Sequence, residues 1–392
     1  QYYTAERMAD DYEELYTRAM EMPAVGGRHC DVLLSGYYGF GNMGDESLLS
    51  VISSSLAKAC PGVRITALTR VPDKDEKRTG LRCVNRMDML SVWREMGKGA
   101  LFLSGGGSLL QDVTSKNGIL YYLGVIKLAQ MMRKKVIVYA QGIGPVNEPR
   151  NRALVAKILN KVQAITVRDF DSRRELMEMG VYREIMVAVD PVLGISADSI
   201  DETQGLQLLR GAEAGYIDGK KMLMVAARNW KHSDRFFKEI AESCDAMAEQ
   251  GWQGVFVPFH YPEDVEAGRN IASLMKRDAV VLSGNYSPQE TMAVLKNADL
   301  IMGMRLHSLI MGAALLKPMV GLSYDPKVTS FMQLLRQPDC YPVDSVEAAQ
   351  LIRSMNRLSQ QTDHEKLMLA RNMEIIARQA KAPAEMILTL RK

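Results

Sequence analysis

The sequence predicts an α/β protein made of two Rossmann-like domains in tandem that face a cleft. The chain has 392 residues, which is too long for one ordinary hydrophobic core. Short apolar runs alternate with amphipathic stretches, the pattern of parallel strands covered by helices on both faces. Glycine-rich loops follow several of these runs, as expected where backbone approaches a ligand at the carboxyl end of a strand.

The composition narrows the class of protein. Hydrophobic residues make up 47% of the chain and charged residues 24%, which is typical of a soluble globular protein. The formal charge of +3 argues against a nucleic-acid surface. No apolar run reaches the roughly 18 residues of a membrane span, and the N-terminus lacks an apolar signal-peptide core. The cysteines show no metal or disulfide spacing, which predicts a reducing, cytoplasmic location: Cys30, Cys60, Cys83, Cys244 and Cys340.

The domain boundaries follow from changes in pattern along the chain. An N-terminal apolar stripe at helical spacing, closed by Pro23 and Gly26, predicts an accessory helix. A polar, glycine-containing stretch in mid-chain predicts the crossing between domains. The expected parts are the accessory helix 1–27, the first domain 28–194, the crossing 195–218, the second domain 219–345, and C-terminal helices 346–392, which could cross back to the first domain.

Within the first domain, β-branched apolar runs predict strands and 3.6-residue periodicity predicts helices. The expected strands are 32–34, 63–68, 100–103, 136–139, 164–167 and 185–189, with helices at 46–59, 119–132, 150–162 and 172–179. The second domain repeats the alternation. Its expected strands are 222–226, 255–258, 280–282, 300–302 and 319–323, with helices at 233–250, 263–276, 288–297, 346–358 and 364–380, and a break at Pro383.

The segment 301–327 gathers basic residues at two strand ends. Strand 300–302 ends at Gly303 and a helical run begins just after His307, so Arg305 and His307 are expected in the strand-to-helix turn. Lys327 follows the next strand. Cations beside a helix N-terminus indicate a phosphate or carboxylate site. The alternative is structural: Arg305 pairs with a carboxylate and His307 caps the helix.

The first glycine loop, 36–46, follows a strand and opens a helix. Its glycine spacing matches neither a dinucleotide fingerprint nor a P-loop. Asp45 and Glu46 suit the start of a helix but would repel a phosphate. This predicts that Asp45 binds a sugar hydroxyl or transfers a proton; the alternative is an N-cap carboxylate.

Two more glycine loops follow neighbouring strands. The loop 104–108 contains Gly106 and Gly107, with Asp112 close behind, and the loop 141–145 follows the next strand. Arg168 ends strand 164–167 and is a second candidate for anion binding, unless it pairs with Asp169 or Asp171. Histidines and carboxylates show no metal-binding spacing.

Taken together, these motifs resemble the polysaccharide pyruvyl transferase family. They occur in the family's order over residues 30–335, and 1–27 lie outside the resemblance. The motifs are Gly36-Tyr37-Tyr38-Gly39-Phe40-Gly41-Asn42-Met43-Gly44-Asp45-Glu46, Gly105-Gly106-Gly107-Ser108, Gln141-Gly142-Ile143-Gly144-Pro145, Val167-Arg168-Asp169-Phe170-Asp171-Ser172, Asp190-Pro191, Met304-Arg305-Leu306-His307-Ser308 and Tyr324-Asp325-Pro326-Lys327.

The resemblance implies a fold similar to the B-type glycosyltransferases. It implies phosphoenolpyruvate as the donor, a pyruvate ketal on a sugar as the product, and neither a metal nor a cofactor. The similarity is greatest to bacterial enzymes acting on N-acetylmannosamine of lipid-linked secondary cell wall polymer precursors. The first domain would then carry the acceptor and the second the donor.

The resemblance also assigns residues. Arg168, Arg305 and His307 match positions that hold phosphoenolpyruvate, with Lys327 as a further cation near the phosphate. His307 suits a general acid, because histidine changes charge near neutral pH, and Arg305 would stabilise the leaving phosphate. The expected acceptor side consists of Asn42, Gly44, Asp45, Gly106, Gly107 and Asp112; the general base, Asp45 or Asp112, stays open.

Two other functions fit the same motifs. One is a metal-independent sugar-nucleotide glycosyltransferase of the B type, which also places basic residues at strand ends. The other is a non-catalytic protein that binds sugars or anions. The basic C-terminal helices could touch an anionic membrane at its inner face, or simply present a solvated face. The sequence leaves the acceptor hydroxyls and the oligomeric state open.

Overall fold

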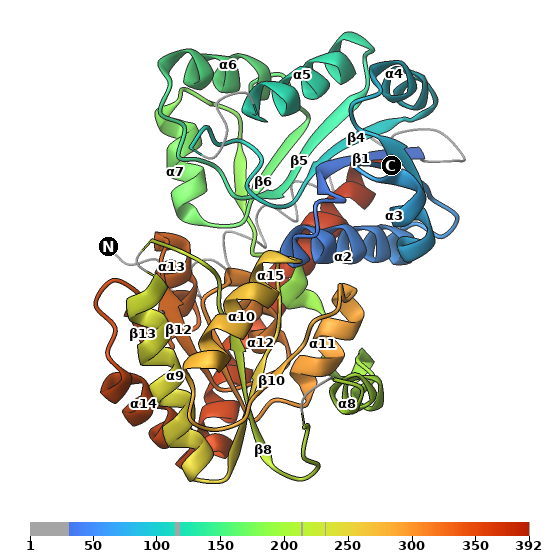
Figure 1. Ribbon diagram of the computed structural model, residues 1–392. Coiled ribbons are helices and arrows are strands. Elements are labelled where there is room, and N and C mark those ends of the chain that lie inside the picture. Colours follow the sequence, from blue (N-terminus) through green and yellow to red (C-terminus); the bar gives the residue numbers. More distant parts are fainter. Residues whose placement is uncertain (1–30, 114–117, 213–214, 232, 392) are drawn as a thin grey trace. The chain divides into compact units, whose positions relative to one another are not determined.

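The computed structural model describes residues 31–113, 118–212, 215–231 and 233–391 (Figure 1). It divides into two compact units. The first contains the described parts of 31–40, 45–194 and 375–391, and the second contains 41–44 and 195–374. The predicted accessory helix 1–27 lies outside the described residues.

The first unit is a seven-stranded parallel sheet in the order β3-β2-β1-β4-β5-β6-β7. Its strands are β1 (Asp31–Tyr38), β2 (Arg64–Thr69), β3 (Arg82–Asn85), β4 (Leu101–Gly105), β5 (Lys135–Gln141), β6 (Ala164–Val167) and β7 (Ile185–Val187). Its helices are α2 (Met43–Ala59), α3 (Pro72–Thr79), α4 (Met89–Lys98), α5 (Gly118–Met131), α6 (Pro149–Leu159) and α7 (Phe170–Glu178).

The core of the first unit explains why these runs form strands. All five residues of β4 are buried, as expected for a central parallel strand covered on both faces. Phe102 of β4 packs in one cluster with Ile126 of α5 and Val138 of β5. The segment 72–98 was missed by the sequence analysis, because α3 is almost entirely polar and β3 is a short strand at the edge of the sheet.

The second unit is a six-stranded parallel sheet in the order β10-β9-β8-β11-β12-β13. Its strands are β8 (Lys221–Ala226), β9 (Trp252–Phe256), β10 (Val280–Val281), β11 (Leu300–Gly303), β12 (Met319–Ser323) and β13 (Cys340–Pro342). Its helices are α8 (Glu202–Arg210), α9 (Ser233–Glu249), α10 (Glu263–Leu274), α11 (Pro288–Lys296), α12 (Leu306–Ala314), α13 (Pro326–Leu334) and α14 (Ala348–Gln360).

The stretch 195–218 is not a crossing between domains but part of the second unit. Its helix α8 packs on α11 at Gly205, where a Cβ atom would lie 2.0 Å from the carbonyl oxygen of Ala293. Asn297 and Lys296 also donate hydrogen bonds to carbonyl oxygens of this stretch. The polar composition misled the sequence analysis, because a glycine contact between two helices leaves little apolar signal.

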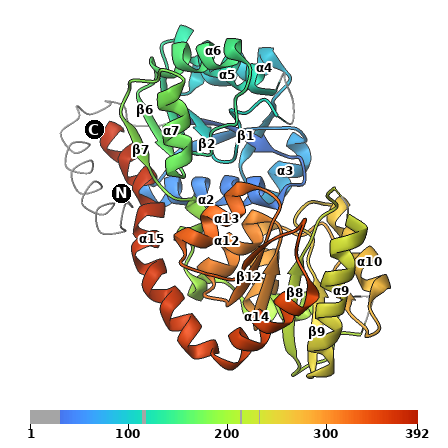
Figure 2. The ribbon, with the colours of Figure 1, turned by 90° about the vertical axis from the view of Figure 1, so that its left-hand side faces the viewer.

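The C-terminal helices differ from expectation at one point. Figure 2 shows α15 (Thr362–Arg391) as a single long helix. Pro383 lies inside it and does not break it, because a helix can tolerate the loss of one backbone hydrogen bond when its neighbours hold it. The part of α15 up to Glu374 belongs to the second unit, and the part from Ile375 belongs to the first. No helix among the described residues is long and apolar enough to span a membrane.

Candidate active-site residues

The carboxyl end of β11 carries the predicted arginine and histidine. Arg305 directly precedes α12 and occupies its N-cap position, and His307 is the second residue of the helix. The helix therefore begins two residues earlier than expected from the sequence. The Ser308 hydroxyl donates a 2.6 Å hydrogen bond to the Arg305 carbonyl oxygen. His307 consequently lies in the first helical turn, where backbone N–H groups favour an anion.

Arg305 is anchored by a buried carboxylate. Its Nε and Nη2 atoms donate hydrogen bonds of 3.0 and 2.6 Å to the two carboxylate oxygens of Asp264, whose side chain is only 1% exposed. Asp264 also accepts hydrogen bonds from the backbone N–H groups of Phe259 and His260. The pairing that we considered as the structural alternative for Arg305 is therefore present. Its Nη1 atom takes no part in the pair, so anchoring and anion binding remain compatible.

The first glycine loop reaches this strand end. Residues 41–44 belong to the second unit, where Met43 donates a 2.8 Å backbone hydrogen bond to Phe259 and Asn42 forms an isolated bridge with His260. A Cβ atom on Gly44 would lie 2.1 Å from Nδ1 of His307. The imidazole thus lies directly on the backbone of Gly44, so only glycine fits beside His307 in this arrangement.

Lys327 lies at the end of the neighbouring strand. It is the second residue of α13, and its backbone N–H donates a 2.9 Å hydrogen bond to the N-cap carboxylate of Asp325. Because β12 pairs directly with β11, Lys327 and His307 occupy equivalent positions in the helices that follow two adjacent strands. The strand pattern of the sequence predicts this placement.

Arg228, which the sequence analysis overlooked, follows β8 on the other side of β11. Its guanidinium carbon lies 5.1 Å from the ring centroid of Trp230 and 5.0 Å from that of Tyr324, and the two rings meet edge-to-face at 4.9 Å. Among the residues that the structure describes, no carboxylate forms an ion pair with Arg228. Arg228 follows the predicted strand 222–226 just as Arg168 follows the predicted strand 164–167, so its position at a strand end is visible in the sequence.

In the first unit, Arg168 follows β6 and is held by the two preceding loops. Its Nη2 atom donates a 3.0 Å hydrogen bond to the hydroxyl of Ser108, and its Nε lies 3.5 Å from a carboxylate oxygen of Asp169. A Cβ atom on Gly142 would lie 2.6 Å from the same Nε. The guanidinium therefore rests on the backbone of Gly142, and its side chain is only 7% exposed.

Asp45 contacts the second glycine loop. A Cβ atom on Gly107 would lie 2.4 Å from a carboxylate oxygen of Asp45, and both Gly106 and Gly107 have the positive φ that favours glycine. Asp45 is not the N-cap of α2. That position belongs to Asn42, whose side-chain oxygen accepts a 3.0 Å hydrogen bond from the backbone N–H of Gly44. Asp45 is thus a nearly buried carboxylate beside a strand-end loop.

Asp112 serves the backbone around the start of α6. Its carboxylate accepts hydrogen bonds from the N–H groups of Asn147 and Glu148, at 2.8 and 3.0 Å, and from the Asn151 amide at 3.0 Å. Desolvation raises the pKa of Asp112, but these donors outweigh it and hold the pKa below its ordinary value. The Asp112 carboxylate therefore holds the loop before α6 in place.

The strand-end residues fall into two groups, one in each unit. Arg305, His307, Lys327 and Arg228 belong to the second unit, together with Gly44, whereas Arg168, Asp45 and Asp112 belong to the first. The convergence of Arg168 with Arg305 and His307 on one ligand stays a prediction. Within the described residues, no cluster of three or more His, Cys, Asp or Glu side chains could hold a metal ion.

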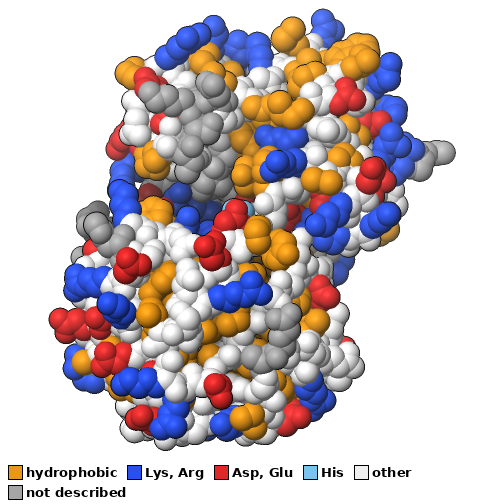
Figure 3. Space-filling view, in the orientation of Figure 1, with side chains coloured by type: hydrophobic (Ala, Val, Ile, Leu, Met, Phe, Trp, Pro, Cys, Tyr) orange, Lys and Arg blue, Asp and Glu red, His pale blue; other side chains and the backbone are white. Residues whose placement is uncertain are grey.

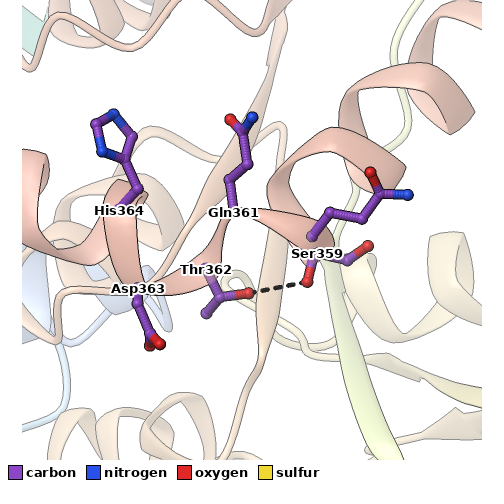
Figure 4. A pocket seen from close by; sticks show the side chains of 6 residues that line it. Ser359, Gln361, Thr362, Asp363 and His364 are labelled. Atoms are coloured by element: carbon purple, nitrogen blue, oxygen red, sulfur yellow. Dashed lines mark hydrogen bonds between the residues drawn. The ribbon is translucent and has the colours of Figure 1, made fainter.

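A pocket of about 630 Å³ lies elsewhere, at the junction of α14 and α15 (Figure 4). Thr362 donates a 3.2 Å hydrogen bond to the carbonyl oxygen of Ser359 across this junction. His364 lines the pocket, but its other lining residues carry no cation and none belongs to a strand end: Ser359, Gln360, Gln361, Thr362 and Asp363. We therefore place the candidate site at the strand ends and not in this pocket.

The two parallel-sheet units give the chain the two-domain fold found in B-type glycosyltransferases. The family model described as polysaccharide pyruvyl transferase matches residues 42–326, and the chain belongs to this family. It is accordingly a pyruvyltransferase, which uses a pyruvyl donor and a saccharide acceptor. No curated protein matches the chain.

Solved structures agree with the predicted fold. The UDP-GlcNAc 2-epimerase from Neisseria meningitidis, bound to UDP-GlcNAc, is 13% identical with a TM-score of 0.60, covering 92% of this chain and 99% of that one. The UDP-GlcNAc 2-epimerase from Methanocaldococcus jannaschii is 14% identical with a TM-score of 0.58, covering 84% of this chain and 92% of that one. Anabaena HepE in complex with UDP-glucose is 12% identical with a TM-score of 0.58, covering 92% of this chain and 98% of that one. The two-domain fold is thereby confirmed.

Replacing Gly44 by Ala should displace the His307 imidazole, because the added methyl group would occupy the space of the ring. We expect turnover to fall by roughly tenfold or more, since a displacement of about 1 Å at a reacting group can cost about 10²-fold. Steady-state kinetics of wild type and Gly44→Ala measure the loss of turnover, and thermal melting shows whether the variant is still folded. Gly97→Ala is the control, because its Cβ would meet only Met132 at an ordinary 3.8 Å. Equal turnover in Gly44→Ala and wild type would contradict the contact.

Asp112→Asn should destabilise the protein by about 1–3 kcal/mol at neutral pH, because backbone N–H donors lose part of their acceptor. The folded-state pKa of Asp112 is lowered, so its contribution is present above the unfolded pKa and is lost as pH falls through the folded pKa. The stability gap to wild type should therefore narrow in acid. Denaturant unfolding across pH measures it, with the exposed Asp198→Asn as control. A gap that stays constant on acidification would exclude this role.

Proposed function

We propose that this enzyme transfers the pyruvyl group of phosphoenolpyruvate to two hydroxyl groups of one sugar, forming a pyruvate ketal and releasing phosphate. The observation that carries the proposal is the row of cations at the ends of the neighbouring strands β8, β11 and β12: Arg228, Arg305, His307 and Lys327. A donor with a phosphate and a carboxylate on three carbons needs several cations close together.

The acceptor is a saccharide, and we infer N-acetylmannosamine of a lipid-linked cell wall polysaccharide precursor, with the enzyme acting in the cytoplasm. This inference rests on the resemblance of the ordered motifs. The acceptor side would consist of Asp45, Gly106, Gly107 and Asp112 from the first unit, with Asn42 and Gly44 from the segment 41–44. Of the two carboxylates, Asp45 suits contact with an acceptor hydroxyl better, because the oxygens of Asp112 already accept three hydrogen bonds from the loop.

The proposed chemistry begins at the enol. A proton from His307 adds to C3 of phosphoenolpyruvate and makes C2 electrophilic. The first sugar hydroxyl attacks C2 and gives up its proton to a base, for which Asp45 is the candidate. The second hydroxyl then displaces phosphate and closes the ketal, and its proton leaves with the phosphate. Arg168, Arg305 and Lys327 stabilise the charge on the departing phosphate.

His307→Gln should lower kcat by roughly 10²–10⁴-fold, the usual contribution of a general acid. The donor should still bind, because the cations remain. The assay is phosphate release from phosphoenolpyruvate that depends on an N-acetylmannosaminyl lipid acceptor, with mass spectrometry for one added ketal. His364→Gln is the matched control, since His364 lines the pocket away from the strand ends. Wild-type turnover in His307→Gln would remove the acid role.

A thermal-shift assay with added ligands separates the proposal from its alternative. A metal-independent B-type glycosyltransferase would be stabilised against heat by uridine diphosphate, and the solved structures bound to UDP-sugars make this the natural comparison. We expect stabilisation by phosphoenolpyruvate and none by uridine diphosphate. The opposite result would favour the glycosyltransferase.

Arg228→Ala should raise KM for phosphoenolpyruvate with a smaller effect on kcat, because a guanidinium without a carboxylate partner is available to the donor anion. We expect roughly a tenfold increase, the loss of one charge-assisted contact. Arg228→Lys should recover only part of the affinity, since lysine lacks the planar group that lies over the rings of Trp230 and Tyr324. Unchanged donor kinetics in both variants would exclude Arg228 from the donor site.

A further inference from the structure

The outer face of α4 is unusually apolar. Met87 just before the helix and three residues of the helix are exposed: Met87 by 70%, Met89 by 47%, Leu90 by 57% and Trp93 by 52%. The inner face of the same helix, at Val92 and Met96, is buried in the core of the first unit. The helix therefore packs with one face and presents a second apolar face to its surroundings.

This concentration is specific to α4. Four large hydrophobic side chains are exposed within the seven residues 87–93, and outside this stretch no seven consecutive residues of the described chain expose more than two. Scattered single apolar residues on a surface need no explanation, but a contiguous group indicates an interaction. Cations follow on the same helix, where Arg94 and Lys98 are exposed.

A basic pocket lies in the same unit. It has a volume of about 400 Å³ and is lined by four cations, Lys127, Arg133, Lys134 and Lys161, together with Gln130, Met131 and Gln163. No carboxylate from the described part of the chain lines it. The two glutamines are engaged by backbone, as Gln130 donates to the Ile158 carbonyl oxygen and Gln163 accepts from the N–H of Val136. The pocket thus offers uncompensated positive charge to an anion.

The pocket and α4 adjoin each other. Lys134, which lines the pocket, donates a 3.0 Å hydrogen bond to the carbonyl oxygen of Gly97, and Gly97 lies one helical turn beyond Trp93. Met131 adds a side chain that is 69% exposed to the lining of the pocket. Figure 3 shows hydrophobic and basic side chains side by side over the α4 and α5 end of the first unit. We call the exposed residues 87–93 together with this pocket the α4 surface.

We propose that the α4 surface docks the enzyme on an anionic phospholipid bilayer, with lipid phosphate groups in the basic pocket and the apolar side chains among the outer acyl chains. Leucine, methionine and tryptophan beside a basic cluster are the composition of interfacial membrane-binding elements. Tryptophan favours the boundary between water and hydrocarbon. A second protein is a poorer fit, because the centre of a stable interface is depleted of charged residues, whereas this surface includes a pocket lined by four cations.

The α4 surface differs from the basic C-terminal helices that the sequence analysis considered. Its evidence is apolar exposure combined with a cationic pocket, whereas those helices offered charge alone. The inference does not depend on the proposed function. Vesicle binding requires neither donor nor acceptor. A negative result in the vesicle experiment would therefore leave the proposed pyruvyl transfer standing, and a failed transfer assay would leave the membrane proposal standing.

The test is sedimentation of the full chain with vesicles of phosphatidylcholine alone or mixed with phosphatidylglycerol. We expect binding to the mixed vesicles, weakened by added salt. The double variant Leu90→Ser with Trp93→Ser should bind at least about tenfold more weakly, since two large apolar side chains are lost. Lys127→Glu with Lys161→Glu should abolish the preference for anionic lipid.

Matched controls are Met177→Ser, a methionine 57% exposed on α7, and Lys220→Glu, an exposed cation of the second unit. Both should bind like wild type, and all variants should keep the wild-type melting temperature and pyruvyl transfer to a water-soluble acceptor. Fluorescence adds a local readout: vesicles should shift the emission to shorter wavelength in wild type but not in Trp93→Phe.

Three results would overturn the proposal. Wild type could fail to bind the mixed vesicles, or the α4 variants could bind as tightly as their controls. Alternatively, light scattering could show that wild type is a dimer that Leu90→Ser with Trp93→Ser separates, in which case a second copy covers this face.

Discussion

The buried carboxylate of Asp264 holds the second unit's strand ends together. It binds Arg305 through two hydrogen bonds and the backbone of Phe259 and His260 through two more. These partners follow β9 and β11, and β8 lies between those two strands in the sheet. A carboxylate with 1% of its side chain exposed would be costly to bury alone, so the four donors are what permit it there.

The geometry around His307 depends on that pair. The backbone of Phe259 and His260, fixed by Asp264, is the edge on which the segment 41–44 lies. That segment in turn brings the bare backbone of Gly44 against the imidazole. The ring is held by packing on backbone, as the proposed proton transfer from His307 would require.

Glycine has the same use beside three of the candidate site residues. Gly44 receives the ring of His307, Gly142 receives the guanidinium of Arg168, and Gly107 receives the carboxylate of Asp45. In each case a charged or titratable side chain rests where a Cβ atom would be. The glycine loops therefore position the protein's own polar side chains, in addition to any contact that they make with a ligand.

The sequence alone determined the alternation of strands and helices, the order of the glycine loops, and the family to which the chain belongs, because hydrophobic periodicity and motif order are properties of neighbouring residues. It did not find α3, β3 and α4, or the place of 195–218, where the local signal is weak. Only the tertiary structure decided that Arg305 is anchored by Asp264, that Arg228 lies over the rings of Trp230 and Tyr324, and that Asn42 rather than Asp45 caps α2. Most of these contacts join residues far apart in the chain, and at the start of α2 the backbone geometry chooses between neighbouring side chains, so no local pattern could have specified them.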